Sequence, residues 1–247
     1  MIAIGAIALR VQLSVAPTAW TFSDTDNPVV EYRELVSYIE STGRPRRLVQ
    51  VDLETQRKVS QYTDIDSSPS GFGKNACGLV AAAAALGGED WKPLVSKIAQ
   101  AAGKDYTARA GIQPLKYVAA LQQVFGTEHV SAIDRGSLGE LYQELDAGQI
   151  VIVDIKVDDN RKVPSAQPPN YAHFARVLGM DIDAREIYIE NTLSGKAYWT
   201  VSLDTFVNAW RLPETSSSII LDRKNAEDVT RWAVVIDGTL IPADNPQ

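Results

Sequence analysis

The chain has 247 residues and a formal net charge of −7, with 45% hydrophobic and 22% charged residues. These fractions are typical of a globular protein long enough to bury a sizeable core, and the acidic balance argues against a nucleic-acid binder. The single cysteine excludes an intramolecular disulfide and a CxxC-type zinc site.

Residues 1–19 combine a short apolar run with small residues, but no Lys or Arg precedes the run. A secretion signal normally begins with such a basic region, so this segment is either a partial signal or a first strand. We favour a secreted or cell-envelope location over a cytoplasmic one. No later stretch approaches the ~20 apolar residues needed to span a membrane.

Asn27 and Pro28 form a helix start, because Asn caps a helix and Pro fits its first position. The apolar spacing that follows predicts a helix over residues 28–41. Alternation over residues 47–61 predicts a β-hairpin. We therefore divide the chain into the segment 1–19, an N-terminal extension over 20–58 and a larger domain over 59–247.

The larger domain begins with helices and continues with strands. A run of five consecutive alanines predicts a short buried helix over residues 77–86. Further helices are expected at 91–102, 112–125 and 138–146, followed by strands at 149–157, 172–180, 186–190 and 197–201, a helix ending at Trp210, and strands at 218–221 and 232–236. Helices followed by an antiparallel sheet predict an α+β domain.

Cys77 lies at the start of the predicted alanine-rich helix. Unpaired N–H groups and the helix dipole at such a position stabilise a thiolate. Gly78 would leave its flank open for a substrate backbone. The alternative is a buried structural cysteine, which is common for this residue type.

His173 begins an apolar strand, and Asn191 ends the next one after a hairpin. Residues at matching ends of an antiparallel pair are neighbours, so Asn191 could orient the His173 imidazole. The alternative for each residue taken alone is structural: an ordinary strand-edge histidine at His173 and an ordinary turn residue at Asn191.

These motifs resemble the C39-like branch of the papain-like cysteine peptidases. The resemblance rests on Asn75-Ala76-Cys77-Gly78-Leu79-Val80, on His173-Phe174-Ala175-Arg176-Val177-Leu178-Gly179, and on Ile187-Tyr188-Ile189-Glu190-Asn191 with Phe206 and Trp210. It implies a papain-like α+β fold and a Cys77-His173-Asn191 triad that cleaves peptide or other amide bonds through an acyl-enzyme. It also implies an oxyanion-hole glutamine upstream, for which Gln61 is the candidate and Gln56 the fallback. The chain departs from the family in having Leu79 where proline is common, and Asn191-Thr192 where Asp-Pro is common.

Other interpretations remain open at this level. The same triad serves acyl transfer to another amine, a non-catalytic peptide-binding domain can use the same fold, and the N-terminal hairpin can be the working part of an envelope-associated protein. We expect no cofactor and no metal site. Asp154, Asp158 and Asp159 could bind a hard cation, but we interpret them as a solvated strand end.

Overall fold

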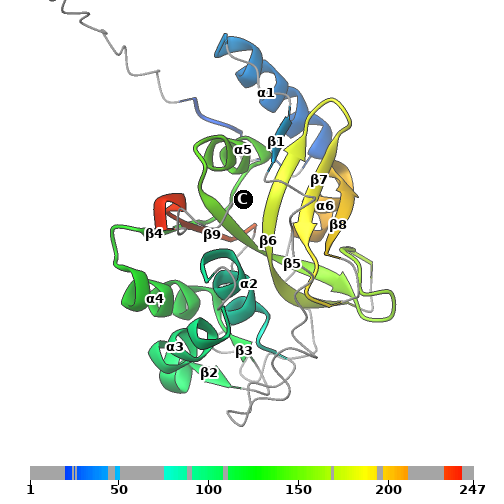
Figure 1. The fold of residues 1–247 in the computed structure, drawn as a ribbon. Coiled ribbons are helices and arrows are strands. Elements are labelled where there is room, and N and C mark those ends of the chain that lie inside the picture. The colour runs from blue at the N-terminus through cyan, green and yellow to red at the C-terminus, as the bar shows by residue number, and fades with distance from the viewer. Residues whose placement is uncertain are drawn as a thin grey trace, which may run out of the picture.

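The computed structural model describes residues 20–23, 25, 27–43, 48–50, 75–87, 91–107, 111–167, 170–193, 197–210 and 231–240. Within these residues, helices cover an antiparallel sheet, which confirms the α+β class (Figure 1). The expected segment 1–19, Gln56, Gln61 and the strand at 218–221 lie outside the described residues.

The main sheet has the strand order β4-β9-β5-β6-β7-β8, and β1 pairs with β6. Its strands are β1 (Leu48–Gln50), β4 (Val130–Ile133), β5 (Ile150–Asp158), β6 (Asn170–Asp181), β7 (Glu186–Glu190), β8 (Tyr198–Ser202) and β9 (Ala233–Ile236). Every strand pair is antiparallel. A separate two-stranded sheet joins β2 (Tyr106–Thr107) to β3 (Gly111–Ile112).

Each face of the main sheet has its own hydrophobic core. On one face, Ile150, Ile152 and Phe174 pack with α2 (Cys77–Leu86), α3 (Lys92–Ala102) and α4 (Pro114–Phe125). On the other face, Val151, Val153 and Ala175 pack with α1 (Pro28–Ser41), α5 (Leu138–Asp146) and α6 (Leu203–Trp210). We call these the α2 face and the α1 face. Because both are covered, the central strands carry buried apolar residues on both sides.

Most predicted elements are confirmed to within two residues. The helix predicted at 28–41 has the predicted bounds, and the side chain of Asn27 accepts a hydrogen bond from Val29 N, as expected of a cap. Residues 48–50 of the predicted 47–61 hairpin form a strand that pairs with β6, and the rest of that hairpin lies outside the described residues. Strand β4 was not predicted.

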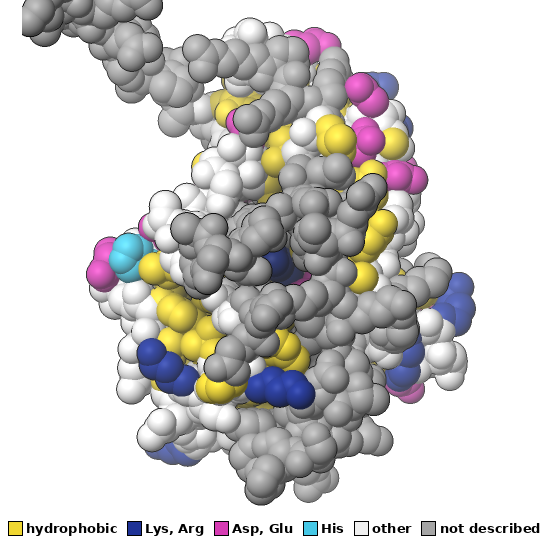
Figure 2. All heavy atoms as spheres, viewed as in Figure 1, with side chains coloured by type: hydrophobic (Ala, Val, Ile, Leu, Met, Phe, Trp, Pro, Cys, Tyr) yellow, Lys and Arg dark blue, Asp and Glu magenta, His cyan; other side chains and the backbone are white. Residues whose placement is uncertain are grey.

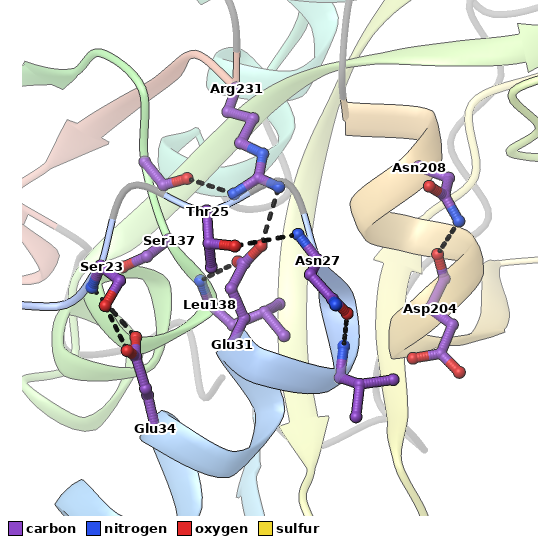
Figure 3. A network of polar contacts seen from close by, with 12 residues as sticks. Ser23, Thr25, Asn27, Glu31, Glu34, Ser137, Leu138, Asp204, Asn208 and Arg231 are labelled. Atoms are coloured by element: carbon purple, nitrogen blue, oxygen red, sulfur yellow. Dashed lines mark hydrogen bonds and ion pairs between the residues drawn. The ribbon is translucent and has the colours of Figure 1, made fainter.

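The N-terminal helix α1 is part of the main core. Leu35 and Ile39 are fully buried among residues of α5 and α6. At the start of α1, the carboxylate of Glu31 lies 2.7 Å from the guanidinium of Arg231 and accepts a hydrogen bond from the backbone N–H of Leu138 (Figure 3). The helix is therefore joined by buried charge to both α5 and the strand end near β9.

Charges are unevenly distributed over the surface. On the side viewed in Figure 2, acidic side chains gather around α1 and the β6–β7 turn, whereas Lys and Arg side chains border a hydrophobic area over α3 and α4. In the described part of the chain, no helix has the length and apolar character required to cross a membrane.

Candidate active site

Cys77 is the first residue of α2, as predicted. Ala76 takes the capping position and makes no side-chain hydrogen bond, so the first backbone N–H groups of the helix depend on other partners. The next nine residues are apolar or small, and most of them are fully buried against β6 and α3. The small alanine side chains let the helix pack closely on the sheet. Cys77 itself keeps part of its surface exposed.

The surroundings of Cys77 favour the protonated thiol. Burial raises its pKa from 9.0 to about 11, and the carboxylate of Asp154 adds to this rise. The backbone N–H of Phe174, followed by those of Gly78 and Cys77, acts in the opposite direction by donating to the sulfur. Burial wins over the helix terminus, so the thiol is neutral at pH 7 in this conformation.

The flank of Gly78 is filled, contrary to our expectation of space for a substrate. A β-carbon on Gly78 would lie 3.1 Å from Cδ2 of Phe174 and 3.4 Å from Cζ of Tyr117. The hydroxyl of Tyr117 also donates to the carbonyl of Gly78 at 2.5 Å. The glycine therefore serves the close approach of α2 to β6.

His173 is buried, with only 1% of its surface exposed. Its Nε2 lies 3.4 Å from the Oγ1 of Thr192, and its ring meets that of Trp199 edge-on, with 6.0 Å between centroids. Burial lowers the pKa of His173 from 6.5 to about 3. The imidazole is therefore neutral over the whole physiological range.

The thiol and the imidazole lie on opposite faces of strand β6. Successive side chains of a strand alternate between faces. Ile155, the cross-strand partner of His173, and Ala175 belong to the core of the α1 face. Phe174 and Cys77 belong to that of the α2 face. The structure thus brings the Cys77 sulfur to the backbone beside His173, but does not bring it to the imidazole.

Asn191 follows β7 directly, as predicted, and is fully buried. Its side-chain oxygen accepts a hydrogen bond from Leu193 N at 3.0 Å, which is the arrangement of an Asx turn. The hairpin does bring this end of β7 to His173, but the side chain placed near Nε2 is that of Thr192. Thr192 and Trp199 were not predicted as neighbours of His173.

Asp154 faces Cys77 from the sheet, and our interpretation of it as part of a solvated strand end is wrong. It is 4% exposed, and its cross-strand partner is Phe174, so it points to the α2 face. The carboxylate accepts a hydrogen bond from the backbone N–H of His173, while Oδ1 is buried with no hydrogen-bond partner. Burial raises the pKa of Asp154 from 3.8 to about 7, and the His173 N–H only partly offsets this.

Arg176 and Glu190 lie on the same face, on neighbouring strands. Ile152 of the α2-face core is the cross-strand partner of Arg176, and Val177 pairs with Ile189, which places Glu190 beside Arg176. Burial lowers the pKa of Arg176 and raises that of Glu190 to about 7, and each charge partly opposes the shift of the other.

No metal centre emerges from these groups. In the ranges that the structure covers, no cluster of three or more His, Cys, Asp or Glu side chains is arranged to hold a metal ion. Asp158 instead caps its own turn by accepting hydrogen bonds from the backbone N–H groups of Asn160 and Arg161, and Asp159 pairs with Lys162.

Comparison with known proteins adds only a similarity of fold. No family model and no curated protein matches the chain. A solved structure from Bacillus anthracis, described as a "putative C39-like peptidase", is similar with a TM-score of 0.48 and 14% sequence identity, over 76% of this chain and 96% of that chain. At this level the similarity carries no argument about the site or the activity.

Proposed function

We propose that this chain is a thiol hydrolase of amide bonds, with Cys77 as the nucleophile, and that the described conformation is its resting state. The observation that carries the proposal is that the sulfur of Cys77, at the start of α2, accepts a hydrogen bond from the backbone N–H of Phe174, the residue directly after His173. The nucleophile therefore lies next to the strand that carries the expected base, but on the opposite face of that strand. The sequence resemblance to C39-like peptidases supports the same assignment.

In the active form, the His173 imidazole takes the proton of Cys77, and the thiolate attacks the amide carbonyl. The imidazolium then protonates the leaving amine, and water releases the acyl group from sulfur. Asn191 would orient the imidazole. Gln61 and the backbone N–H of Cys77 would donate to the oxyanion. The same acyl-enzyme can pass its acyl group to another amine.

Activation requires the imidazole to reach the α2 face. A one-residue change in the pairing of a strand moves its side chains to the opposite face. His173 lies only three residues from the start of β6 at Asn170, so a bulge confined to this end would suffice. The same strand already contains a register irregularity between Val177 and Gly179.

The test is turnover of a library of fluorogenic peptidyl amides. We expect Cys77→Ser and His173→Gln each to lower kcat/KM by at least about 10⁴-fold, as for other nucleophile–base pairs. His129→Gln is the matched control, because His129 lies at the surface beside Asp237 and should leave turnover unchanged. Turnover that survives Cys77→Ser would disprove the assignment.

A second candidate, a non-catalytic peptide-binding domain on the same fold, is favoured by the high pKa of Cys77 and by the position of the imidazole on the other face. It predicts that peptides bind equally well to the wild type and to Cys77→Ser, and that no amide is cleaved. Binding without turnover, measured on the same library, would select this candidate.

A further inference from the structure

Three neighbouring strands place charged side chains on the α2 face, beside Cys77. They are Asp154 of β5, Arg176 of β6 and Glu190 of β7, with exposed fractions of 4%, 6% and 5%. Charged side chains this deeply buried are costly unless they are paired. Each of the three nevertheless has one polar atom without a hydrogen-bond partner: Oδ1 of Asp154, Nε of Arg176 and Oε2 of Glu190.

The carboxylate of Asp154 differs from the other two groups in having no charged partner among the described residues. Arg176 and Glu190 act on one another and offset each other's charge. Asp154 is stabilised only by the backbone N–H of His173, and in the part of the chain that the structure describes no cationic group acts on its carboxylate. Lys156 is also buried and lies two residues further along the same face of β5, but it is not among the groups that act on the Asp154 carboxylate. Among the described residues, the carboxylate of Asp154 beside the thiol therefore has no cation acting on it, and its Oδ1 has no hydrogen-bond donor.

We propose that Asp154 binds a cationic group of a ligand next to Cys77, so that the hydrolase proposed above acts on amides that carry a basic, ammonium or guanidinium side chain. The substrate class rests on the proposed function, whereas the cation site does not. An N–H donor from such a group would give Oδ1 its missing hydrogen bond and offset the buried charge. Tyr106 and Tyr117 lie near enough to Cys77 to respond to its charge, and aromatic neighbours suit a bound cation.

The site can be probed through the thiol, because Cys77 is the only cysteine and is partly exposed. The probes are 2-aminoethyl methanethiosulfonate, which is cationic, and its neutral 2-hydroxyethyl analogue. Each forms a mixed disulfide with the thiolate and releases methanesulfinate. The rate of each probe with Cys77 is divided by its rate with glutathione, which corrects for the intrinsic reactivity of the probe. At pH 8.5 we expect this normalised rate to be about tenfold higher for the cationic probe than for the neutral one.

Variants at Asp154 then assign the effect. Asp154→Asn should abolish the preference for the cationic probe, and Asp154→Glu should retain it. Asp159→Asn is the matched control, because it removes an exposed carboxylate just beyond the same strand and should leave the preference intact. Thermal unfolding of each variant checks that the fold is preserved.

Three results would overturn the proposal: equal rates of both probes on the wild type, an unchanged preference in Asp154→Asn, or a native Cys77 that neither probe reaches although both modify the urea-unfolded chain. The substrate assay tests the substrate class. We expect a higher kcat/KM for peptidyl amides that carry Arg than for those that carry Gln, and Asp154→Asn should remove this difference. If no amide is cleaved but the probe preference depends on Asp154, the hydrolase fails and the cation site stands. If amides are cleaved without regard to charge, the hydrolase stands and the preference for basic substrates fails.

Discussion

Phe174 and Gly78 approach one another so closely that a β-carbon on Gly78 would lie 3.1 Å from the ring of Phe174. The same ring also packs on Tyr117 and Trp232, with centroid distances of 5.0 Å and 5.9 Å. Because neighbouring side chains of a strand alternate, anchoring Phe174 on the α2 face directs His173 to the other one. One packing contact therefore determines where the imidazole lies relative to the thiol.

Gly78→Ala should destabilise the protein. Overpacking costs about 1–3 kcal/mol, and the better helix propensity of alanine returns up to about 1 kcal/mol, so we expect a net loss of about 1–2 kcal/mol. Urea unfolding monitored by tryptophan fluorescence measures this loss. Combining Gly78→Ala with Phe174→Leu should cost less than the sum of the two single changes, because the smaller side chain makes room. Strictly additive effects of the two changes would show that they do not share this contact.

The alkylation rate of Cys77 by iodoacetamide should rise tenfold per pH unit from pH 7 to 9.5 without levelling off. The reason is that burial raises the pKa of Cys77 to about 11, so the thiolate fraction is still growing across this range. In the urea-unfolded chain, the rate should level off near pH 9, because a free thiol has a pKa of about 8.5. His173→Gln should leave the native profile unchanged. A plateau near pH 6 that His173→Gln abolishes would mean that the thiolate–imidazolium pair is already formed in the resting protein.

Acidification should reveal the burial of His173. Its folded-state pKa of about 3 lies below the ordinary value of 6.5, so its contribution to stability is complete above pH 6.5 and is lost as the pH falls towards 3. The difference in unfolding free energy between the wild type and His173→Gln should shrink by about 1.4 kcal/mol per pH unit below pH 6. Urea titrations at pH 6.5, 5.5 and 4.5 give this difference.

For Asp154 we expect the stability to depend on pH in the opposite direction. The pKa of Asp154 is raised to about 7, so the stability linked to its protonation is present below pH 3.8 and is lost as the pH rises through 7. Relative to Asp154→Asn, the wild type should therefore lose stability between pH 4 and 7. A pH-independent difference for either variant would contradict the burial of that group.

Arg231→Met should destabilise the protein by about 3–5 kcal/mol, because it leaves the buried carboxylate of Glu31 without its cation. The double variant Glu31→Leu/Arg231→Met should cost less than the single one, since no uncompensated charge remains. Asp159→Asn, which removes one partner of an exposed pair, should cost less than about 1 kcal/mol. Strictly additive effects of Glu31→Leu and Arg231→Met would exclude a coupled pair.

The local elements could be predicted from the sequence because their signals are local. Asn27 and Pro28 define the start of α1, and the alanine run after Cys77 defines α2 with the observed bounds. The pairing of β1 could not be predicted, because its partner in β6 lies far along the chain and alternation alone suggests a nearby hairpin. The placement of Cys77 at a helix start beside the strand of His173 was predicted. The face of β6 on which the imidazole lies was not.

The reason lies in the two-sided burial of the central strands. In β6, Phe174, Ala175 and Val177 are all buried although they point to different faces, so apolar periodicity does not say which face meets α2. Asp154 was misjudged for the same reason: an Asp between Val153 and Ile155 is expected near solvent, yet helices cover the sheet on both sides. Tertiary packing decides both assignments.

The ion pair between Glu31 and Arg231 has a consequence for where the polypeptide can be shortened. A fragment that begins at residue 59 would contain every residue of the proposed triad, yet it would lack α1, and the space filled by Leu35 and Ile39 would open to water. In this fragment the buried Arg231 guanidinium would also lose its ion pair with Glu31. The smallest autonomous folding unit must therefore start no later than the Asn27 cap, and the first helix is as indispensable to the fold as the strands that hold Cys77 and His173 in place.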